Sequence, residues 1–194
     1  IGFLRPAVER SFNSITVDGE CSTNDAVCLL ANGASGVERT PATDAAFSLA
    51  LGRVCEQLAE QIVADGEGAT VLAEIDVTGA VDDAQARAIA SRIATSPLVK
   101  TALFGRDANW GRVLAAAGSA PFDGGFASVE PARLSLAYNG TQVLERGRPL
   151  GAEPDVSNGH CRIELELGLG AGSASYLTSD LSYDYVRINA DYRS

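Results

Sequence analysis

The sequence is poor in the residues that most often bind metals or build disulfide frameworks. It has one histidine, His160, and no C-x-x-C pair. Its four cysteines are Cys21, Cys28, Cys55 and Cys161. Three of them lie in apolar or helical patterns, so their spacing argues against zinc and against disulfides, and favours a reducing compartment. We therefore predict no metal site, and the lack of a G-x-S-x-G turn argues against a Ser-His-Asp triad built on His160.

Positive charge and long apolar runs are also scarce. The 15 Lys and Arg residues stand against 25 Asp and Glu residues, which gives a net charge of -10 and a pI of about 4.5. An acidic surface repels phosphate, so we expect neither nucleic acid nor an anionic membrane as a partner. No apolar run approaches the roughly 20 residues of a membrane-spanning helix, and Arg5-Pro6 comes too early for a signal peptide. We therefore expect a cytoplasmic protein.

Methionine is missing altogether, including from the first position. Either the protein avoids methionine or the 194 residues are a piece of a longer chain. That length is enough for a hydrophobic core in one large domain or two small ones. With 46% hydrophobic and 21% charged residues, the composition is that of a globular protein.

Helical patterns dominate the first part of the chain. Thr40-Pro41 predicts the start of a long helix, with Thr as N-cap and Pro at the first helical position. One face of that helix carries Phe47, Leu51, Val54, Leu58 and Ile62. Other helices are predicted at residues 5–13, at 82–94, at 110–117 and, as a largely buried helix closed by Asn32-Gly33, at 26–31.

Strand patterns dominate the second part. Asn139-Gly140 predicts a type I′ hairpin turn between residues 134–138 and 141–144. Further strands are predicted at 15–17, 69–77, 98–104, 163–167, 174–178 and 183–188. The mixture of helices, antiparallel hairpins and other strands predicts an α+β fold in layers, with a sub-boundary near 119–131 between the two parts.

The turn DGEGAT at residues 65–70 joins the end of the long helix to the strand pattern that follows. Its two glycines flank a single carboxylate, Glu67, and glycine allows another backbone or a ligand to approach closely. This arrangement is also compatible with an ordinary helix stop, with glycine at the C-cap. The turn alone therefore marks Glu67 as a candidate and does not assign its function.

Several blocks together resemble the ornithine acetyltransferase (glutamate N-acetyltransferase) family of arginine biosynthesis. They are SFN at 11–13, ITVDG at 15–19, STND at 22–25, LLANG at 29–33, DGEGAT at 65–70, SPLVKTA at 96–102, NWGRV at 109–113 and YVRINADYRS at 185–194. The resemblance is to the C-terminal half of a precursor that cuts itself before a threonine. It implies that residues 1–194 are the β chain of a two-chain enzyme, which also explains the missing methionine.

The resemblance implies a fold and a partner. The family fold is a layered α/β/β/α sandwich with mixed and antiparallel strands, shared between this β chain and the α chain of the same precursor. An assembly of α2β2 or larger follows from the resemblance. It implies no cofactor, and it leaves open whether acetyl-CoA serves as a second acetyl donor.

The resemblance also implies a reaction. Acetyl passes from N2-acetylornithine to the N-terminal threonine of the β chain and then to glutamate, and the threonine α-amine serves as base. The substrate contacts that match this sequence are Glu67, Asn189 and Ser194. The nucleophilic threonine is not in the sequence, since Ile1 to Leu4 resembles the residues just after it. We expect that residues are missing around that end.

Other departures from the family pattern are small. Glu20-Cys21 replaces the usual Asp-Thr, Val71 stands where a basic residue is common, and Ser194 replaces a threonine while keeping the hydroxyl. Two alternatives stay open beside the acetyltransferase. One is a self-cleaving aminopeptidase of similar fold, and the other is an inactive relative without the threonine nucleophile.

Overall fold

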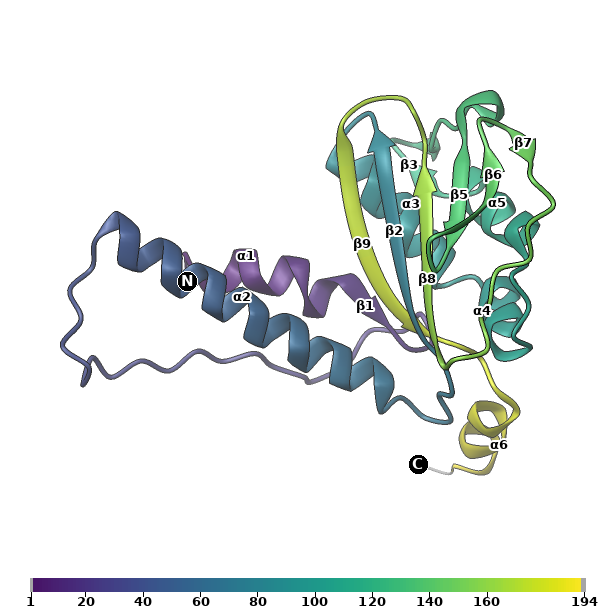
Figure 1. Cartoon of the computed structure of the whole chain (residues 1–194). Coiled ribbons are helices and arrows are strands. Elements are labelled where there is room, and N and C mark those ends of the chain that lie inside the picture. Colours follow the sequence, from purple (N-terminus) through teal and green to yellow (C-terminus); the bar gives the residue numbers. More distant parts are fainter. Residues whose placement is uncertain (1, 193–194) are drawn as a thin grey trace.

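The structure is a computed structural model that describes residues 2–192. Its centre is a seven-stranded sheet in the order β1-β9-β2-β8-β5-β6-β7 (Figure 1). The strands are β1 (Ile15–Thr16), β2 (Leu72–Ala80), β5 (Ser135–Tyr138), β6 (Thr141–Glu145), β7 (Arg148–Pro149), β8 (His160–Glu166) and β9 (Gly172–Ser179). A separate two-stranded ribbon contains β3 (Pro121–Phe122) and β4 (Gly125–Phe126).

The sheet is mixed. β2 runs parallel to β8 on one side and antiparallel to β9 on the other, and β5 and β6 form an antiparallel hairpin. The hairpin turns at Asn139 and Gly140, whose φ angles of 49° and 78° are the two positive values that a type I′ turn requires. The predicted α+β class and the predicted hairpin are thus confirmed.

Helices cover one face of this sheet. They are α3 (Asp83–Ala94), α4 (Pro97–Phe104) and α5 (Trp110–Gly118). Alternate residues of β2 point toward them, and Ala73, Ile75 and Val77 are each 0% exposed. Ile89 and Ile93 of α3 are also 0% exposed and belong to the same core. Burial of each such aliphatic side chain contributes about 1.5–3 kcal/mol, so this layer holds the sheet together.

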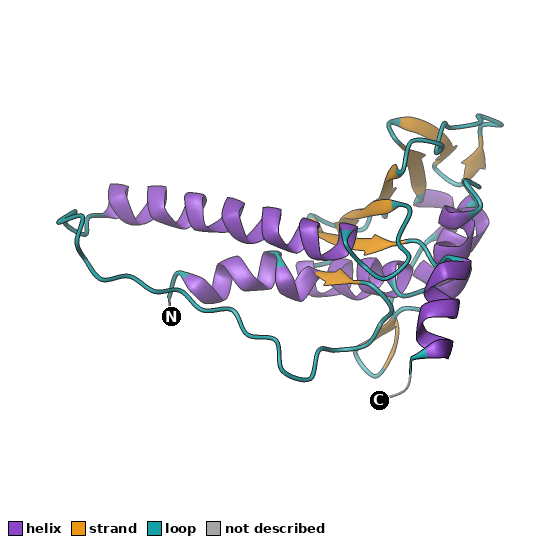
Figure 2. Ribbon diagram, turned by 90° about the horizontal axis from the view of Figure 1, so that it is seen from below, coloured by secondary structure: helices purple, strands orange, loops and turns teal. Residues whose placement is uncertain are grey.

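The remaining helices lie outside that layer. α1 (Leu4–Arg10) packs along α2 (Pro41–Ala64), and both extend away from the sheet (Figures 1 and 2). α6 (Tyr183–Asp191) follows β9 near the C-terminus, and two short 3-10 helices lie at Phe12–Ser14 and Pro131–Arg133. Within the described residues, no helix is both long and apolar enough to cross a membrane.

The predicted start of α2 is confirmed. Thr40 accepts a hydrogen bond from the Thr43 backbone N–H, and Pro41 follows it. The buried side of α2 consists of small residues and one valine, namely Gly52, Cys55, Ala59 and Val63. Its larger apolar residues face solvent instead, with Phe47, Val54, Leu58 and Ile62 between 41% and 52% exposed.

The helix that we predicted at residues 26–31 is wrong. The segment is extended, all of its residues are exposed, and it belongs to an arm over residues 17–40 that loops away from the sheet below α2 (Figure 1). No backbone hydrogen bond joins residues 26–32 to another backbone group of the described chain. The conformation of an apolar run without helical periodicity depends on the groups around it, and none of the described residues covers this run.

Two predicted strands are also wrong, because both are helices. Residues 98–104 lie in α4, which begins with Pro97 at a position that favours helix starts. Residues 183–188 lie in α6, where Ser182 accepts a hydrogen bond from the Tyr185 backbone N–H and so caps the helix. Short apolar runs do not distinguish strand from helix by periodicity. The boundary near 119–131 stays a prediction, and that segment carries the ribbon β3–β4.

Candidate active site

The turn at residues 65–70 projects Glu67 into solvent at the end of α2. Gly66 donates to the Val63 carbonyl at 3.2 Å, and Ala69 donates to the Gly66 carbonyl at 3.0 Å. Gly68 has a φ of +65°, and a Cβ there would lie 2.5 Å from the Tyr185 backbone nitrogen. The second glycine is therefore required both by the backbone angle and by the close approach of α6.

That approach brings two of the predicted site residues together. Nδ2 of Asn189 donates to Oε2 of Glu67 at 2.7 Å and to the Tyr185 carbonyl at 3.1 Å. Both side chains are exposed. Among the described residues, no hydrogen bond reaches the Asn189 amide oxygen or the second Glu67 oxygen. Both oxygens are therefore available as acceptors, and the second Glu67 oxygen can pair with a cation or an amine.

The third predicted residue, Ser194, lies outside the described residues. It follows α6 by three positions, since that helix ends at Asp191. The structure therefore does not test its assignment, which stays a prediction.

Two polar residues before α6 contact the turn and were missed by the sequence analysis. The Asp180 carboxylate accepts hydrogen bonds from the Thr70 backbone N–H at 2.8 Å, the Thr70 hydroxyl at 2.6 Å and the Val71 backbone N–H at 2.9 Å. The Ser182 hydroxyl donates to the Gly68 carbonyl at 2.7 Å. Neither residue lies in a sequence motif that would have indicated a functional role.

A third segment reaches the same end of the molecule. The Tyr185 hydroxyl donates to the Asp18 carboxylate at 3.1 Å. Partial burial, and then the hydrogen bond to Asp18, raises the pKa of Tyr185 above its usual value. The ITVDG block at 15–19 therefore meets α6, so that segments from the start, middle and end of the sequence converge around Glu67.

Lys100 lies buried behind this cluster and is 3% exposed. Its ammonium group donates to the Thr178 hydroxyl at 3.0 Å and to the Ser179 carbonyl. Burial lowers the pKa of Lys100 to about 8, and the nearby Asp180 and Asp18 carboxylates partly oppose that shift. The residue thus holds β9 against α4 just before the chain reaches Asp180.

The arginines around Trp110 are engaged within the chain. Arg112 donates to the Leu98 carbonyl at 2.8 Å, and Arg106 donates to the Thr70 carbonyl at 3.1 Å. Trp110 is partly buried and packs against the main core. These contacts favour a structural role for Arg112 and Trp110, whereas Nη1 of Arg106 is buried without a partner among the described residues.

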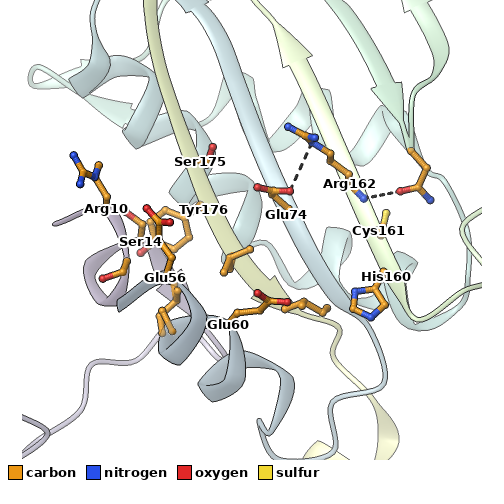
Figure 3. A pocket seen from close by; sticks show the side chains of 16 residues that line it. Arg10, Ser14, Glu56, Glu60, Glu74, His160, Cys161, Arg162, Ser175 and Tyr176 are labelled. Atoms are coloured by element: carbon orange, nitrogen blue, oxygen red, sulfur yellow. Dashed lines mark hydrogen bonds and ion pairs between the residues drawn. The ribbon is translucent and has the colours of Figure 1, made fainter. Parts of the chain in front are cut away.

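A separate hollow lies between α1, α2 and the uncovered face of the sheet (Figure 3). It measures about 460 Å³ and is lined largely by charged and polar side chains, among them Arg10, Glu56, Glu60, Glu74, His160 and Arg162. Arg162 pairs with Asp76 at 2.6 Å and with Glu74 at 3.7 Å. Burial, and then repulsion from Asp76, raises the pKa of Glu74.

Neither Glu67 nor Asn189 lines that hollow. We therefore place the candidate active site at the converging segments and not in the hollow, which lies on a sheet face that this chain leaves open. In the part of the chain that the structure describes, no group of three or more His, Cys, Asp or Glu side chains could hold a metal ion.

Comparison with known proteins identifies the family. A family model described as the ArgJ family matches residues 2–194. The arginine biosynthesis bifunctional protein ArgJ of Syntrophotalea carbinolica is 46% identical over 200 residues, which cover 98% of this chain and 50% of that protein. The glutamate N-acetyltransferase of Methanopyrus kandleri is 44% identical over 201 residues, which cover 99% of this chain and 51% of that protein. The chain belongs to the ArgJ family.

A solved structure has the same fold. The crystal structure of arginine biosynthesis bifunctional protein ArgJ from Bacillus halodurans matches with a TM-score of 0.89 and 40% identity, covering 98% of this chain and 92% of that chain. The predicted fold class and the suspected family are therefore both confirmed. The chain spans about half the length of the curated relatives it matches.

Proposed function

We propose that this chain is the β chain of an ornithine acetyltransferase, which transfers acetyl from N2-acetylornithine to glutamate. The observation that carries the proposal is the hydrogen bond between Glu67 and Asn189, which joins two residues that the family resemblance places at the substrate. The names of the relatives, which include a glutamate N-acetyltransferase, support the same reaction.

The chemistry proceeds in two acyl transfers. The hydroxyl of an N-terminal threonine attacks the acetyl carbonyl, a C–O bond forms, and the amide C–N bond breaks to release ornithine. Glutamate's amine then attacks the acetyl ester, the C–O bond breaks, and the threonine hydroxyl is restored. The threonine's own α-amine, with a pKa near 8, accepts and returns the proton. Hydrogen-bond donors from the α chain stabilise the oxyanion in each step.

Glu67 and Asn189 recognise the amino-acid part of the substrates in this proposal. The Glu67 carboxylate pairs with the ammonium of ornithine or orients the attacking amine. The free amide oxygen of Asn189 accepts a hydrogen bond, and the Ser194 hydroxyl makes a further contact. Ornithine and glutamate are both small α-amino acids, so one pocket serves both in turn.

The partner in this proposal is the α chain of the same precursor. The chain covers 92% of the solved ArgJ chain but only 50% of a curated full-length relative, which supports a protein that consists of two chains of similar length. The apolar face of α2 is exposed at Leu58 and Ile62, and Leu30 of the arm is 93% exposed. These surfaces support the presence of a second chain, because removal of apolar groups of this size from water lowers the free energy.

Three finer points belong to the same proposal. The assembly is α2β2 or larger, the protein works in the cytoplasm, and N2-acetylornithine is an acetyl donor whether or not acetyl-CoA is a second one. A relative from Postia placenta is named as mitochondrial, so the compartment differs within the family.

A transfer assay tests the proposal directly. The protein is produced from its full-length gene and given N2-acetylornithine and glutamate, and N-acetylglutamate is measured. We expect transfer by the unmodified protein and its loss in Glu67→Ala. Peptide hydrolysis without formation of N-acetylglutamate would overturn the proposal and indicate an aminopeptidase. The absence of both activities would indicate an inactive relative.

A further inference from the structure

Asn189 lies on α6, a helix with little apolar packing to hold it in place. None of its residues is buried. Helices of this length are marginal in water unless tertiary packing supports them. The aromatic contact between Tyr183 and Phe104, with ring centroids 5.2 Å apart, is at the first residue of the helix and far along it from Asn189. Polar contacts must therefore fix the helix relative to the Glu67 turn.

Ser182 makes the contact that joins the two elements. Its hydroxyl donates to the Gly68 carbonyl at 2.7 Å and accepts from the Tyr185 backbone N–H at 3.1 Å. One side chain, 4% exposed, thus caps α6 and ties that cap to the turn. Gly68 and the first turn of α6 are in direct contact, so a shift of the helix start is transmitted to the turn.

Asp180 holds the other side of the same turn. Its carboxylate is 3% exposed and accepts from the Thr70 backbone N–H, the Thr70 hydroxyl and the Val71 backbone N–H. Because buried backbone donors require partners, these bonds fix the point where the turn enters β2. Asp180 and Ser182 are two positions apart, so the segment between β9 and α6 holds the turn at two points, Gly68 and Thr70.

Lys100 braces this segment from α4. Its ammonium group donates to Thr178 at 3.0 Å, and its carbonyl accepts from the Leu181 backbone N–H at 3.2 Å. The residues on both sides of Asp180 are therefore fixed to a rigid helix of the core. The positions of Asp180 and Ser182, and therefore of their contacts with the turn, are set by α4 and the sheet.

We propose that Asp180 and Ser182 are positioning residues, which set Glu67 and Asn189 at the spacing that substrate recognition requires without touching the substrate. The inference rests on the proposed function for the role of that spacing, but the mechanical coupling between turn and helix stands on the contacts alone. It predicts that loss of the Ser182 hydroxyl weakens substrate binding, because Asn189 is displaced relative to Glu67.

Hydrogen exchange tests the coupling without any assay of activity. In Ser182→Ala, amides in α6 and in residues 65–70 should exchange roughly five- to tenfold faster, as loss of an N-cap predicts, while β2 and β8 keep their protection. Asp82→Ala is the matched control, since Asp82 caps α3 at the opposite end of β2 and accepts from the Gln85 N–H at 2.8 Å. Faster exchange of the turn in the control, or unchanged exchange in Ser182→Ala, would overturn the coupling.

A double-mutant cycle tests the route to the substrate. In the protein from the full-length gene, Ser182→Ala should raise KM for N2-acetylornithine about tenfold with a smaller change in kcat, as expected when a binding contact is misplaced. The same change should have a clearly smaller effect in an Asn189→Ala background, where only a displacement of Glu67 remains. Additive effects on KM would show that Ser182 acts by another route and would overturn the inference.

A second substitution at Ser182 keeps the test decisive. Should Ser182→Ala lower the melting temperature of the whole protein, Ser182→Gly serves instead, because glycine keeps most of the capping ability and lacks the hydroxyl that reaches Gly68. If the unmodified protein transfers no acetyl group, the proposed function fails, whereas the exchange comparison still decides whether Ser182 couples the turn to α6.

Discussion

Asn189 donates a hydrogen bond of 2.7 Å to Glu67, although 122 positions separate the two residues in the sequence. Neither side chain is buried, and each comes from a different element, the turn after α2 and the helix α6. An exposed hydrogen bond of this kind contributes only about 0.5–1.5 kcal/mol to stability. This small contribution to stability is consistent with the substrate contact that we propose for the pair.

Replacement of Glu67 should lower activity strongly and change stability only slightly. We expect Glu67→Ala to lower kcat/KM for acetyl transfer by about 10²-fold or more, in line with loss of a charged substrate contact. The melting temperature should fall by no more than a few degrees, because Glu67 is exposed and loses only one surface hydrogen bond. Glu145→Ala, at an exposed position of β6, is the matched control. Near-normal turnover of Glu67→Ala would contradict the role assigned to this carboxylate.

The close contact at Gly68 predicts a large cost for any side chain. Gly68→Ala introduces a Cβ at φ +65° only 2.5 Å from the Tyr185 backbone nitrogen. We expect thermal unfolding to show a loss of at least 2–3 kcal/mol, more than the strain of the backbone angle alone. Gly124→Ala is the control, because Gly124 has a φ of +76° and no atom within 4 Å of the added Cβ. Equal losses for the two variants would show that α6 does not press on the turn.

The exposed face of α2 predicts a docking surface for the second chain. Leu58→Glu with Ile62→Glu should reduce recovery of the partner chain when both are purified together, because two charges would enter an apolar interface. Gln57→Glu adds a charge at a neighbouring exposed position of the same helix and should leave recovery unchanged. Full recovery of the partner with the Leu58 and Ile62 variant would place the interface elsewhere.

The buried ammonium group of Lys100 predicts a dependence of stability on pH. The pKa of Lys100 is lowered to about 8 in the folded state from its ordinary value of 10.5. The unfolded chain therefore binds more protons between these values, and the free energy of unfolding should rise with pH across that window. The shift corresponds to an increase of about 3 kcal/mol from this group.

Comparison with Lys100→Met isolates that contribution. The variant should show a flatter dependence of the free energy of unfolding on pH between 8 and 10.5 than the unmodified protein. The other titratable groups are common to both proteins, so only the difference between the two curves reports on Lys100. Parallel curves would mean that Lys100 keeps an ordinary pKa in the fold.

Much of the layered core could be predicted from the sequence. The alternation of Val71, Ala73, Ile75 and Val77 identified a half-buried strand, and the Asn139-Gly140 turn identified a hairpin, because both signals are local. The segments at 98–104 and 183–188 were mistaken for strands, since short apolar runs are ambiguous until Pro97 or Ser182 is seen to start a helix.

The candidate site was only partly predictable for a related reason. Glu67 and Asn189 were found through the family resemblance, whereas Asp180 and Ser182 owe their importance to contacts over 100 positions away in the sequence. The arm at 17–40 could not be predicted from local pattern either. Its apolar residues are exposed, because none of the described residues packs over them.

In the proposed mechanism the β chain carries an acetyl group during turnover, and mass spectrometry of the protein from the full-length gene can detect that group. The protein is incubated with N2-acetylornithine alone, and the masses of its chains are measured before and after glutamate is added. We predict that the chain containing Glu67 gains one acetyl group on an N-terminal threonine and loses it when glutamate arrives. A chain that stays unmodified under both conditions would contradict the acetyl-enzyme and, with it, the proposed function.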